Sequence, residues 1–240
     1  MNVYITSKSL KQYHMRTSIV LIAITLLSWN ASAQKEVAHE LYKFSEVKAY
    51  DGITVKLISS DVNKAVITGD NKSEVAFVNK SGRLKIRMEL DNFLAGHNTT
   101  VMLYHTETLV LLDVNEKAKI VSDDVIRSVS LEMRAQEGGE LQLKVEAEKV
   151  DVKATTGGIV SLSGTSKVQD ISVNTGGVVK NESLKTEQTE VSVNAGGTAN
   201  VNATDIVDAK VRAGGTINIY GNPKEVKETK FVGGNINSMN

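Results

Sequence analysis

The chain has 240 residues, of which 41% are apolar and 23% charged, a balance that argues against wholesale disorder and allows a buried core. Its 28 lysine and arginine residues equal its 28 aspartate and glutamate residues, so the charge pattern does not favour a protein that neutralises many phosphates, and we expect no nucleic-acid partner. It has no cysteine, which excludes disulfides, thiolate metal sites, cysteine nucleophiles and a lipidated cysteine anchor.

The first 33 residues have the pattern of a secretory signal peptide. Basic residues without acidic ones precede an apolar run at residues 19–27, and Ala31-Ser32-Ala33 offers small residues at a cleavage site. The apolar run is roughly half of the ~20 residues that a transmembrane helix needs, so a retained membrane anchor is the weaker alternative. We therefore expect an exported protein, in the periplasm, on the outer-membrane surface or outside the cell, with no transmembrane segment after residues 1–33 are removed.

Residues 34–133 predict less regular strands. Several short segments are rich in β-branched and apolar residues and are separated by turn signals such as Asp51-Gly52. Paired glycines are absent from this half, so we expect irregular coils or a sheet that caps a more regular part, because an open stack would expose strand edges. The expected strands are 47–50, 53–58, 65–68, 75–78, 84–88, 99–104 and 109–114.

Two histidines in this half, His97 and His105, lie eight residues apart and could be imagined as a metal-binding pair. Polar residues around His97 favour a loop, which would separate the two rings. We therefore favour two isolated surface histidines.

Residues 134–240 contain paired glycines at near-regular spacing. The first glycines of successive pairs are separated by 19, 19, 20, 18 and 19 residues, and the segments beside them alternate apolar and polar residues, as in strands with one buried face. A unit of about 19 residues cannot bury its own inner face, so copies must stack. The repeat predicts an all-β, single-stranded parallel β-helix, or β-solenoid, over one domain, residues 34–240. The first glycines are Gly138, Gly157, Gly176, Gly196, Gly214 and Gly233.

These glycines are expected to form one corner of the stack, where the backbone needs a positive φ or leaves no room for a Cβ atom. A phosphate-binding loop is the weaker alternative, since no Lys-Ser or Lys-Thr follows any pair. Asn174 and Asn194, two residues before their pairs, predict a ladder of amides hydrogen-bonded between coils. The predicted structural turn residues are Gly157, Gly158, Gly176, Gly177, Gly196, Gly197, Gly214, Gly215, Gly233 and Gly234.

A carboxylate stands six residues before each of five successive glycine pairs, so stacking would align five acidic side chains. A bound Ca²⁺ or a basic partner would relieve their repulsion, but Lys153, Lys210 and Arg134 lie close enough to neutralise part of the column. We favour a charged face that keeps the sheet soluble, and we expect no catalytic residue and no cofactor, with Ca²⁺ as the alternative. The acidic column comprises Glu132, Asp151, Asp170, Glu190 and Asp208.

Three features of the sequence together resemble a known family. The segment at residues 44–58, the hairpin at 82–86 and the glycine pairs running to Gly233-Gly234 resemble the putative auto-transporter adhesin, head GIN domain family, a secreted bacterial domain of unknown function. The resemblance covers nearly all of residues 40–237. It implies a right-handed parallel β-helix with a non-enzymatic, adhesive role, and it supplies no catalytic residues. The repeats run almost to residue 240, so the family name is not taken as a sign of an auto-transporter secretion route.

The sequence thus predicts a secreted binding or structural module that recognises a surface glycan or protein with the faces of a solenoid; it leaves the oligomeric state open. Two alternatives remain: a carbohydrate-active enzyme like the β-helix polysaccharide lyases, and an envelope scaffold that acts through a protein partner. The enzyme is disfavoured because no histidine follows His105 and the coils hold only Tyr220 and Phe231 as aromatic residues.

Overall fold

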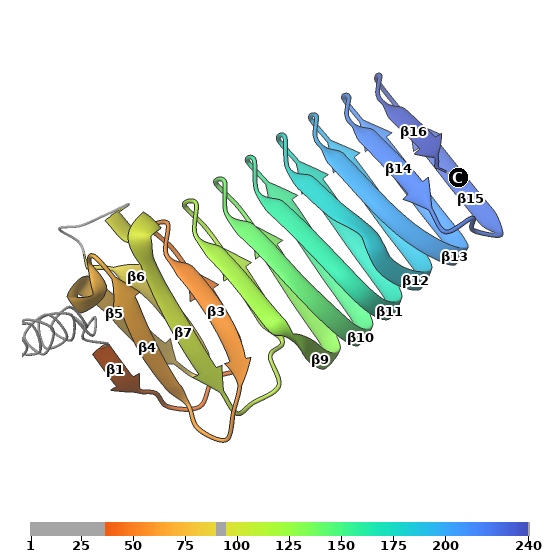
Figure 1. Cartoon of the computed structure of the whole chain (residues 1–240). Coiled ribbons are helices and arrows are strands. Elements are labelled where there is room, and N and C mark those ends of the chain that lie inside the picture. The colour runs from red at the N-terminus through yellow and green to blue at the C-terminus, as the bar shows by residue number, and fades with distance from the viewer. Residues whose placement is uncertain (1–36, 90–94, 240) are drawn as a thin grey trace, which may run out of the picture. The chain divides into compact units, whose positions relative to one another are not determined.

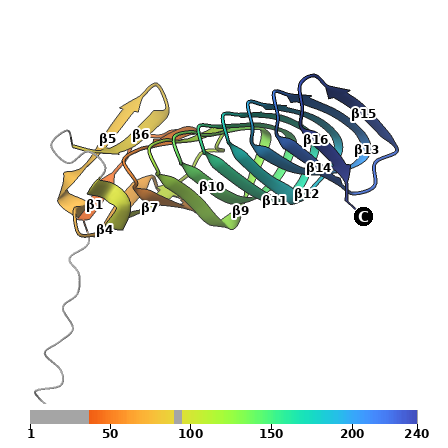
Figure 2. The same cartoon turned by 90° about the horizontal axis from the view of Figure 1, so that it is seen from above.

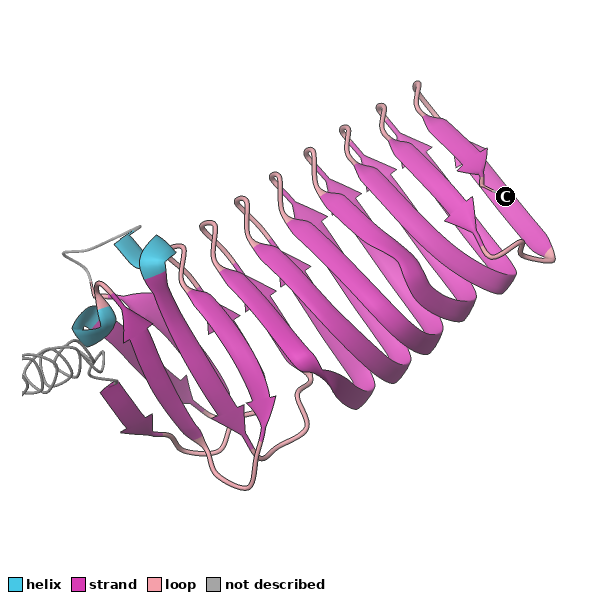
Figure 3. Ribbon diagram, in the orientation of Figure 1, coloured by secondary structure: helices cyan, strands magenta, loops and turns pink. Residues whose placement is uncertain are grey.

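A computed structural model gives the structure of the protein and describes residues 37–89 and 95–239. The described part is nearly all β and forms a β-solenoid of about seven turns, with parallel coils of about 19 residues (Figures 1 and 3). The fold class expected from the glycine repeat is therefore confirmed. The predicted signal peptide, residues 1–33, lies outside the described residues. No helix in the described ranges has the length and apolar character needed to cross a membrane.

Each regular coil contains one long strand that bends in the middle, so that the coil has two arms. The arm after a glycine turn belongs to sheet A, which includes Glu140–Val145, and the arm before the next turn belongs to sheet B, which includes Lys149–Thr155. The turns form one edge of the solenoid and the bends form the other (Figure 1). The long strands are β9 (Lys119–Ala135), β10 (Glu140–Thr155), β11 (Ile159–Asn174), β12 (Val178–Asn194) and β13 (Thr198–Arg212).

Neighbouring coils pair in parallel, and the register repeats the glycine spacing. Leu141 pairs with Val160 in sheet A, and Val152 pairs with Ile171 in sheet B. All four side chains are buried, because alternate residues of both arms point between the two sheets. The apolar core therefore consists of columns that run along the solenoid, one residue from each coil.

The N-terminal part uses the same two-arm coils but stacks them out of sequence order. β2 (Glu46–Ala49) and β3 (Thr54–Ser59) form a coil that pairs in parallel with β8 (Leu111–Val114) and β9. β6 (Arg83–Met88) and β7 (Thr99–His105) follow later in the chain but pair on the other side of β2 and β3. The chain then crosses back to β8.

Antiparallel strands close this end of the solenoid (Figure 2). β4 (Lys64–Gly69) pairs with β7, and β1 (Val37–Glu40) pairs with β4, both antiparallel. β5 (Val75–Lys80) pairs antiparallel with β6 in sheet B. Two 3-10 helices, η2 (Lys72–Glu74) and η4 (Ala95–Asn98), also lie in this part.

Regular pairing begins one coil before the first glycine pair. β8 pairs in parallel with the second arm of β9. In the turn that follows β8, Lys117, with a φ of +61°, stands where the next turn carries Gly138, and Glu116, with a φ of +52°, aligns with Glu137. The regular part of the solenoid therefore starts upstream of residue 134.

Three shorter strands follow β13: β14 (Thr216–Tyr220), β15 (Glu225–Lys230) and β16 (Asn235–Ser238). The pairing of β15 with β13 places Glu228 beside Ala209 and Lys230 beside Val211, although both β13 residues are buried in the core. Glu228 and Lys230 pair with each other, with 3.1 Å between Oε2 and Nζ. Charged side chains thus occupy positions that point inward in the preceding coils.

Candidate functional site

The glycine turns are built on a left-handed backbone. In the turn between β10 and β11, Thr156 and Gly157 have φ of +49° and +73°, and the Gly158 amide donates to the Thr155 carbonyl oxygen at 2.9 Å. Positive φ at both central residues is typical of a type I′ turn, which leads the chain from sheet B of one coil into sheet A of the next.

The two glycines of a pair are required for different reasons. A Cβ atom at Gly157 would meet nothing within 4 Å, so only its positive φ favours glycine. A Cβ atom at Gly158 would lie 2.1 Å from the carbonyl oxygen of Ala135 in the preceding coil, a distance that the backbone cannot accept. The same holds for the next pair: a Cβ atom at Gly176 would meet nothing within 4 Å, whereas one at Gly177 would lie 2.3 Å from the Ala154 carbonyl oxygen. The remaining predicted turn glycines all have positive φ: Gly196, Gly197, Gly214, Gly215, Gly233 and Gly234.

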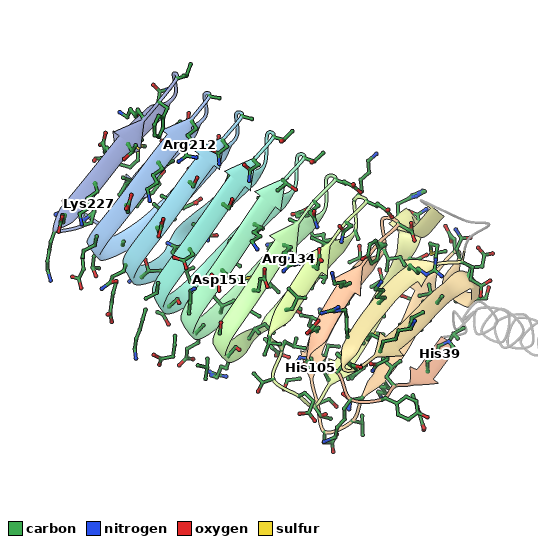
Figure 4. The ribbon with its side chains drawn as sticks, turned by 180° about the vertical axis from the view of Figure 1, so that it is seen from behind. His39, His105, Arg134, Asp151, Arg212 and Lys227 are labelled. Atoms are coloured by element: carbon green, nitrogen blue, oxygen red, sulfur yellow. The ribbon has the colours of Figure 1, made fainter. Side chains whose placement is uncertain are left out.

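The acidic column lies in register on the outward face of sheet B, where Figure 4 labels one member, Asp151. Asp170 pairs with Asp151 on one side and with Glu190 on the other. Glu132 pairs with Asp151, and Asp208 pairs with Glu190. The structure therefore brings all five carboxylates together as neighbours along the solenoid.

Basic residues of the chain itself bridge these carboxylates. The ammonium nitrogen of Lys149 lies 3.0 Å from an oxygen of Asp151 and 2.8 Å from one of Asp170. Hydrogen bonds to Asp170 and Asp151 raise the pKa of Lys149 above its ordinary value. Lys210 bridges the next two carboxylates, at 2.9 Å from Glu190 and 3.4 Å from Asp208.

Glu132, at the other end of the column, is held by Arg134 at 2.7 Å and by Lys153 at 3.2 Å. Burial acts to raise the pKa of Glu132, but hydrogen bonds from these two cations outweigh it, and the pKa is lowered. No group of three or more histidine, aspartate or glutamate residues in the described ranges is arranged to hold a metal ion. The column is thus cross-linked by lysine and arginine, of which sequence analysis missed Lys149, two residues before Asp151 on the same strand face.

The amides of Asn174 and Asn194 do not form the predicted ladder. The two residues are in register, but each Nδ2 donates to the serine two residues earlier in its own strand, at 3.1 Å to Ser172 and 3.3 Å to Ser192. That prediction is wrong because a nearby hydroxyl competes with the neighbouring coil for the amide.

A ladder of asparagines lies instead on the outward face of sheet A. Asn218 Nδ2 donates to Asn200 Oδ1 at 2.9 Å, and Asn237 Nδ2 donates to Asn218 Oδ1 at the same distance. These bonds connect three successive coils. The intervals of 18 and 19 residues between these asparagines, visible in the sequence, are the signal that could have found this ladder.

The two histidines lie apart, as expected, but differ in exposure. His97 belongs to η4 and is exposed, while His105, which is labelled in Figure 4, ends β7 and is buried. His105 Nδ1 lies 3.0 Å from the carbonyl oxygen of Glu107, so we assign the proton to Nδ1. The expectation that His105 is a surface residue is wrong, because β-strand alternation turns it inward.

Two carboxyl groups that sequence analysis did not single out meet where the turns after β2 and β8 stack. Asp51 is buried and its Oδ2 accepts a hydrogen bond from the Met88 amide at 2.9 Å. Burial, together with hydrogen bonding to Asp51 and its charge, raises the pKa of Glu116. Both residues line a cavity of about 460 Å³ that also contains Tyr50. Because Asp51 is committed to a backbone amide, we assign this pair a structural role in joining β6 to the turn edge.

Two β-bulges frame a groove of about 570 Å³ on the outward face of sheet A. In β9, the residues 122–124 stand opposite Leu143 alone; in β12, Asn181 and Glu182 stand opposite Leu162 alone. A bulge bends the strand locally, so the two bulged segments form the walls of the groove on either side of the sheet A arms of β10 and β11. The 20-residue glycine interval in the sequence is the signal of the second bulge.

A buried polar network holds the second bulge. Asn181 points inward and donates to Gln169 Oε1 at 3.2 Å, while Gln169 Nε2 donates to the Thr189 hydroxyl at 2.9 Å. Thr186 contacts the Thr189 hydroxyl at 2.9 Å and donates to the Asn202 carbonyl oxygen. These buried bonds fix the position of Glu182, which follows Asn181.

The groove places two lysines beside hydroxyl and amide groups. Lys144 and Lys180 line it together with outward residues of β10 and β11, and neither lysine forms an ion pair with a described residue. Of the two wall carboxylates, Asp123 pairs with Lys56 at 2.5 Å, whereas Glu182 accepts a hydrogen bond from the neutral amide of Asn200 at 3.2 Å and keeps its negative charge. With two lysines outside any ion pair and one such carboxylate, the groove lining is net positive.

Comparisons with known proteins agree with this architecture. The family described as putative auto-transporter adhesin, head GIN domain matches residues 43–223. A search of curated proteins gives no match.

Three crystal structures share the fold. A putative adhesin from Bacteroides fragilis is 20% identical, with a TM-score of 0.76, over 86% of this chain and 98% of that one. A putative adhesin from Parabacteroides distasonis is 18% identical, with a TM-score of 0.68, over 85% and 96% of the two chains. A putative lipid binding protein from the same species is 15% identical, with a TM-score of 0.65, over 86% and 96%. Because the family match covers most of the chain, this protein belongs to the putative auto-transporter adhesin, head GIN domain family.

Proposed function

We propose that the protein is an exported, non-enzymatic binding module, adhesin-like in action, that recognises a surface glycan with the outward faces of its solenoid. The family and the adhesins of similar fold support an adhesin-like role. The pattern of a signal peptide at residues 1–33 supports export.

The parallel register is the observation that carries the proposal. It repeats outward side chains from coil to coil at a spacing of about 4.8 Å, as in the acidic column and the asparagine ladder. A long polymer with a short chemical repeat can contact such an array at many successive points. Weak contacts then add up through multivalency.

The interior of the solenoid is filled, which favours recognition on the surface. Val145, Val160 and Val179 are among the side chains that pack between the sheets with almost no exposure. Lipid binding, the role in the name of one structural relative, would require an apolar cavity for the acyl chain.

The test is binding and cleavage measured together. The purified protein is immobilised, bacterial envelope polysaccharides are passed over it, and retained and released material is assayed for new reducing ends and unsaturated sugars. We expect saturable retention without cleavage. Cleavage products that disappear in the Asp170→Asn variant would establish an enzyme instead.

An envelope scaffold gives a different result in the same format. A scaffold would retain one protein from a detergent extract of envelopes and no polysaccharide. That outcome would overturn the proposal of glycan recognition.

A further inference from the structure

We infer that the groove between the two bulges of sheet A binds an acidic oligosaccharide, and that Lys144 and Lys180 hold two of its negatively charged groups. This inference rests on the proposed function and names the site and the ligand class within it.

The groove is a departure from an otherwise regular surface. Its floor consists of β10 and β11, which follow the coil repeat, and its walls are the bulges of β9 and β12. Each wall is supported from behind: Ser122 donates to the Leu57 carbonyl oxygen at 3.3 Å, and Asn181 joins the buried network. A concave site with supported walls is preorganised, which lowers the entropic cost of binding.

The groove carries a net positive charge. Asp123 is paired with Lys56, and the exposed Lys144 and Lys180 outnumber the remaining lining carboxylate, Glu182. Lys180 shares a column with Gln142, and Lys144 lies two residues further along the same strand as Gln142. Strand spacing then separates the two lysine Cα atoms by about 12 Å. Two negative groups on different sugar units of one chain can reach both lysines.

The floor offers hydrogen bonds from its outward side chains. Gln142, Ser161 and Ser163 face outward, while Leu143 and Leu162 point into the core. β10 and β11 are each paired on both sides, so a peptide cannot add to them as an extra strand. A peptide would also lack a pocket for an apolar anchor. Hydroxyl-rich sugars with acidic substituents match this surface better than an acidic peptide does.

No residue lining the groove is aromatic, so stacking on sugar rings does not contribute. Binding therefore depends on charge and hydrogen bonds. We expect a weak interaction with a single groove, one that falls as the salt concentration rises.

The experiment is isothermal titration calorimetry with three probes: tetragalacturonate, neutral cellotetraose and tetraglutamate. We expect tetragalacturonate to bind, and to bind several-fold less tightly at about 0.15 M salt than at low ionic strength. Cellotetraose and tetraglutamate are expected to bind at least tenfold more weakly. Tighter or equal binding of tetraglutamate would overturn the assignment of a sugar ligand.

Variants locate the binding site. We expect Lys144→Ser and Lys180→Ser each to weaken tetragalacturonate binding about tenfold, the size of one charge-assisted hydrogen bond. Lys80→Ser removes an exposed lysine from β5 in sheet B and serves as the matched control, with no change expected. Ser163→Tyr fills the floor without removing charge and should also abolish binding. Thermal unfolding checks that each variant is folded.

The outcomes separate this inference from the proposed function. Binding of tetragalacturonate that is unchanged in all three groove variants would overturn the groove as the site and leave glycan recognition standing. Failure of tetragalacturonate to bind at low ionic strength would overturn the inference, and the polysaccharide retention assay then decides on the proposed function by itself.

Discussion

The regular coils β9 to β13 and the N-terminal part up to β8 use the same two-arm coil but are organised differently. In the regular part, coils that are neighbours in the chain are neighbours in space. In the N-terminal part, the coil of β6 and β7 lies outside the coil of β2 and β3, and the ion pair of Lys48 with Asp113 joins residues 65 positions apart. The regular part is therefore determined by a local repeat, and the N-terminal part by particular long-range contacts.

This difference predicts different weak points. In the regular part, the backbones of successive coils approach closely at the glycine edge, so adding even a small side chain there should strongly lower the free energy of unfolding. In the N-terminal part, a buried side-chain contact joins distant segments, so removing that contact should strongly lower it. The predictions below test this contrast.

The largest effect is expected from Gly158→Ala. Its Cβ would lie 2.1 Å from the Ala135 carbonyl oxygen, so the two coils must move apart, at a cost of about 4 kcal/mol in the free energy of unfolding. The adjacent Gly157→Ala is the matched control, since only its φ of +73° is unfavourable, and we expect a loss of about 1 kcal/mol. Urea unfolding measures both. Equal losses at the two positions would contradict the assignment of separate roles.

Asp113→Ala is expected to cost about 3 kcal/mol, because it leaves the largely buried Lys48 without its partner at 2.8 Å. Asp170→Ala removes a carboxylate that also pairs with a lysine at 2.8 Å but is 40% exposed, and we expect less than about 1 kcal/mol. Both are measured by urea unfolding at neutral pH. A similar loss for the two variants would show that burial does not distinguish the N-terminal pair from the acidic column.

Glu116→Gln should stabilise the protein at neutral pH. The pKa of Glu116 is raised in the folded state by burial and by Asp51, so its favourable contribution is complete below the ordinary value of 4.5 and is lost as the pH rises through the raised value. Glutamine keeps the hydrogen bond to Asp51 without the charge. We expect Tm to rise by about 3 °C at pH 7.5 and to be unchanged at pH 4. A rise of the same size at both pH values would exclude titration of Glu116 as the cause.

The smallest expected effect is a gain from Thr175→Asn. Thr175 has a φ of +48°, which is strained for a β-branched residue, whereas asparagine adopts this conformation readily at the first central position of a type I′ turn. We expect Tm to rise by about 2 °C. Thr165→Asn, at an exposed strand position of the same coil, is the control and should not raise Tm. A gain in both variants would mean that turn strain is not its source.

The regular part could be predicted from the sequence because each coil contacts the next one along the chain. Alternation fixed which residues face inward, and the distance from each glycine pair was sufficient to align Glu132 with Asp151. Both results depend only on a period near 19 residues.

Other features of the fold and of the site could not be predicted, because they depend on long-range contacts or on side-chain rotamers. The order of the coils of β2 and β6 depends on pairing between distant segments, which no local pattern encodes. The inward orientation of the Asn181 side chain depends on partners, such as Gln169, that only the folded coils bring together. The choice of Asn174 between its own serine and the next coil is a matter of side-chain rotamer, which register alone does not determine.

The charged pair at inward positions of β15 has a consequence for how the protein behaves at high concentration. If two solenoids met through this coil, Glu228 and Lys230 would have to leave water and lie against the apolar columns of the other molecule. These two charges therefore oppose fibre growth through this coil, as charges on the edge strands of other β proteins do.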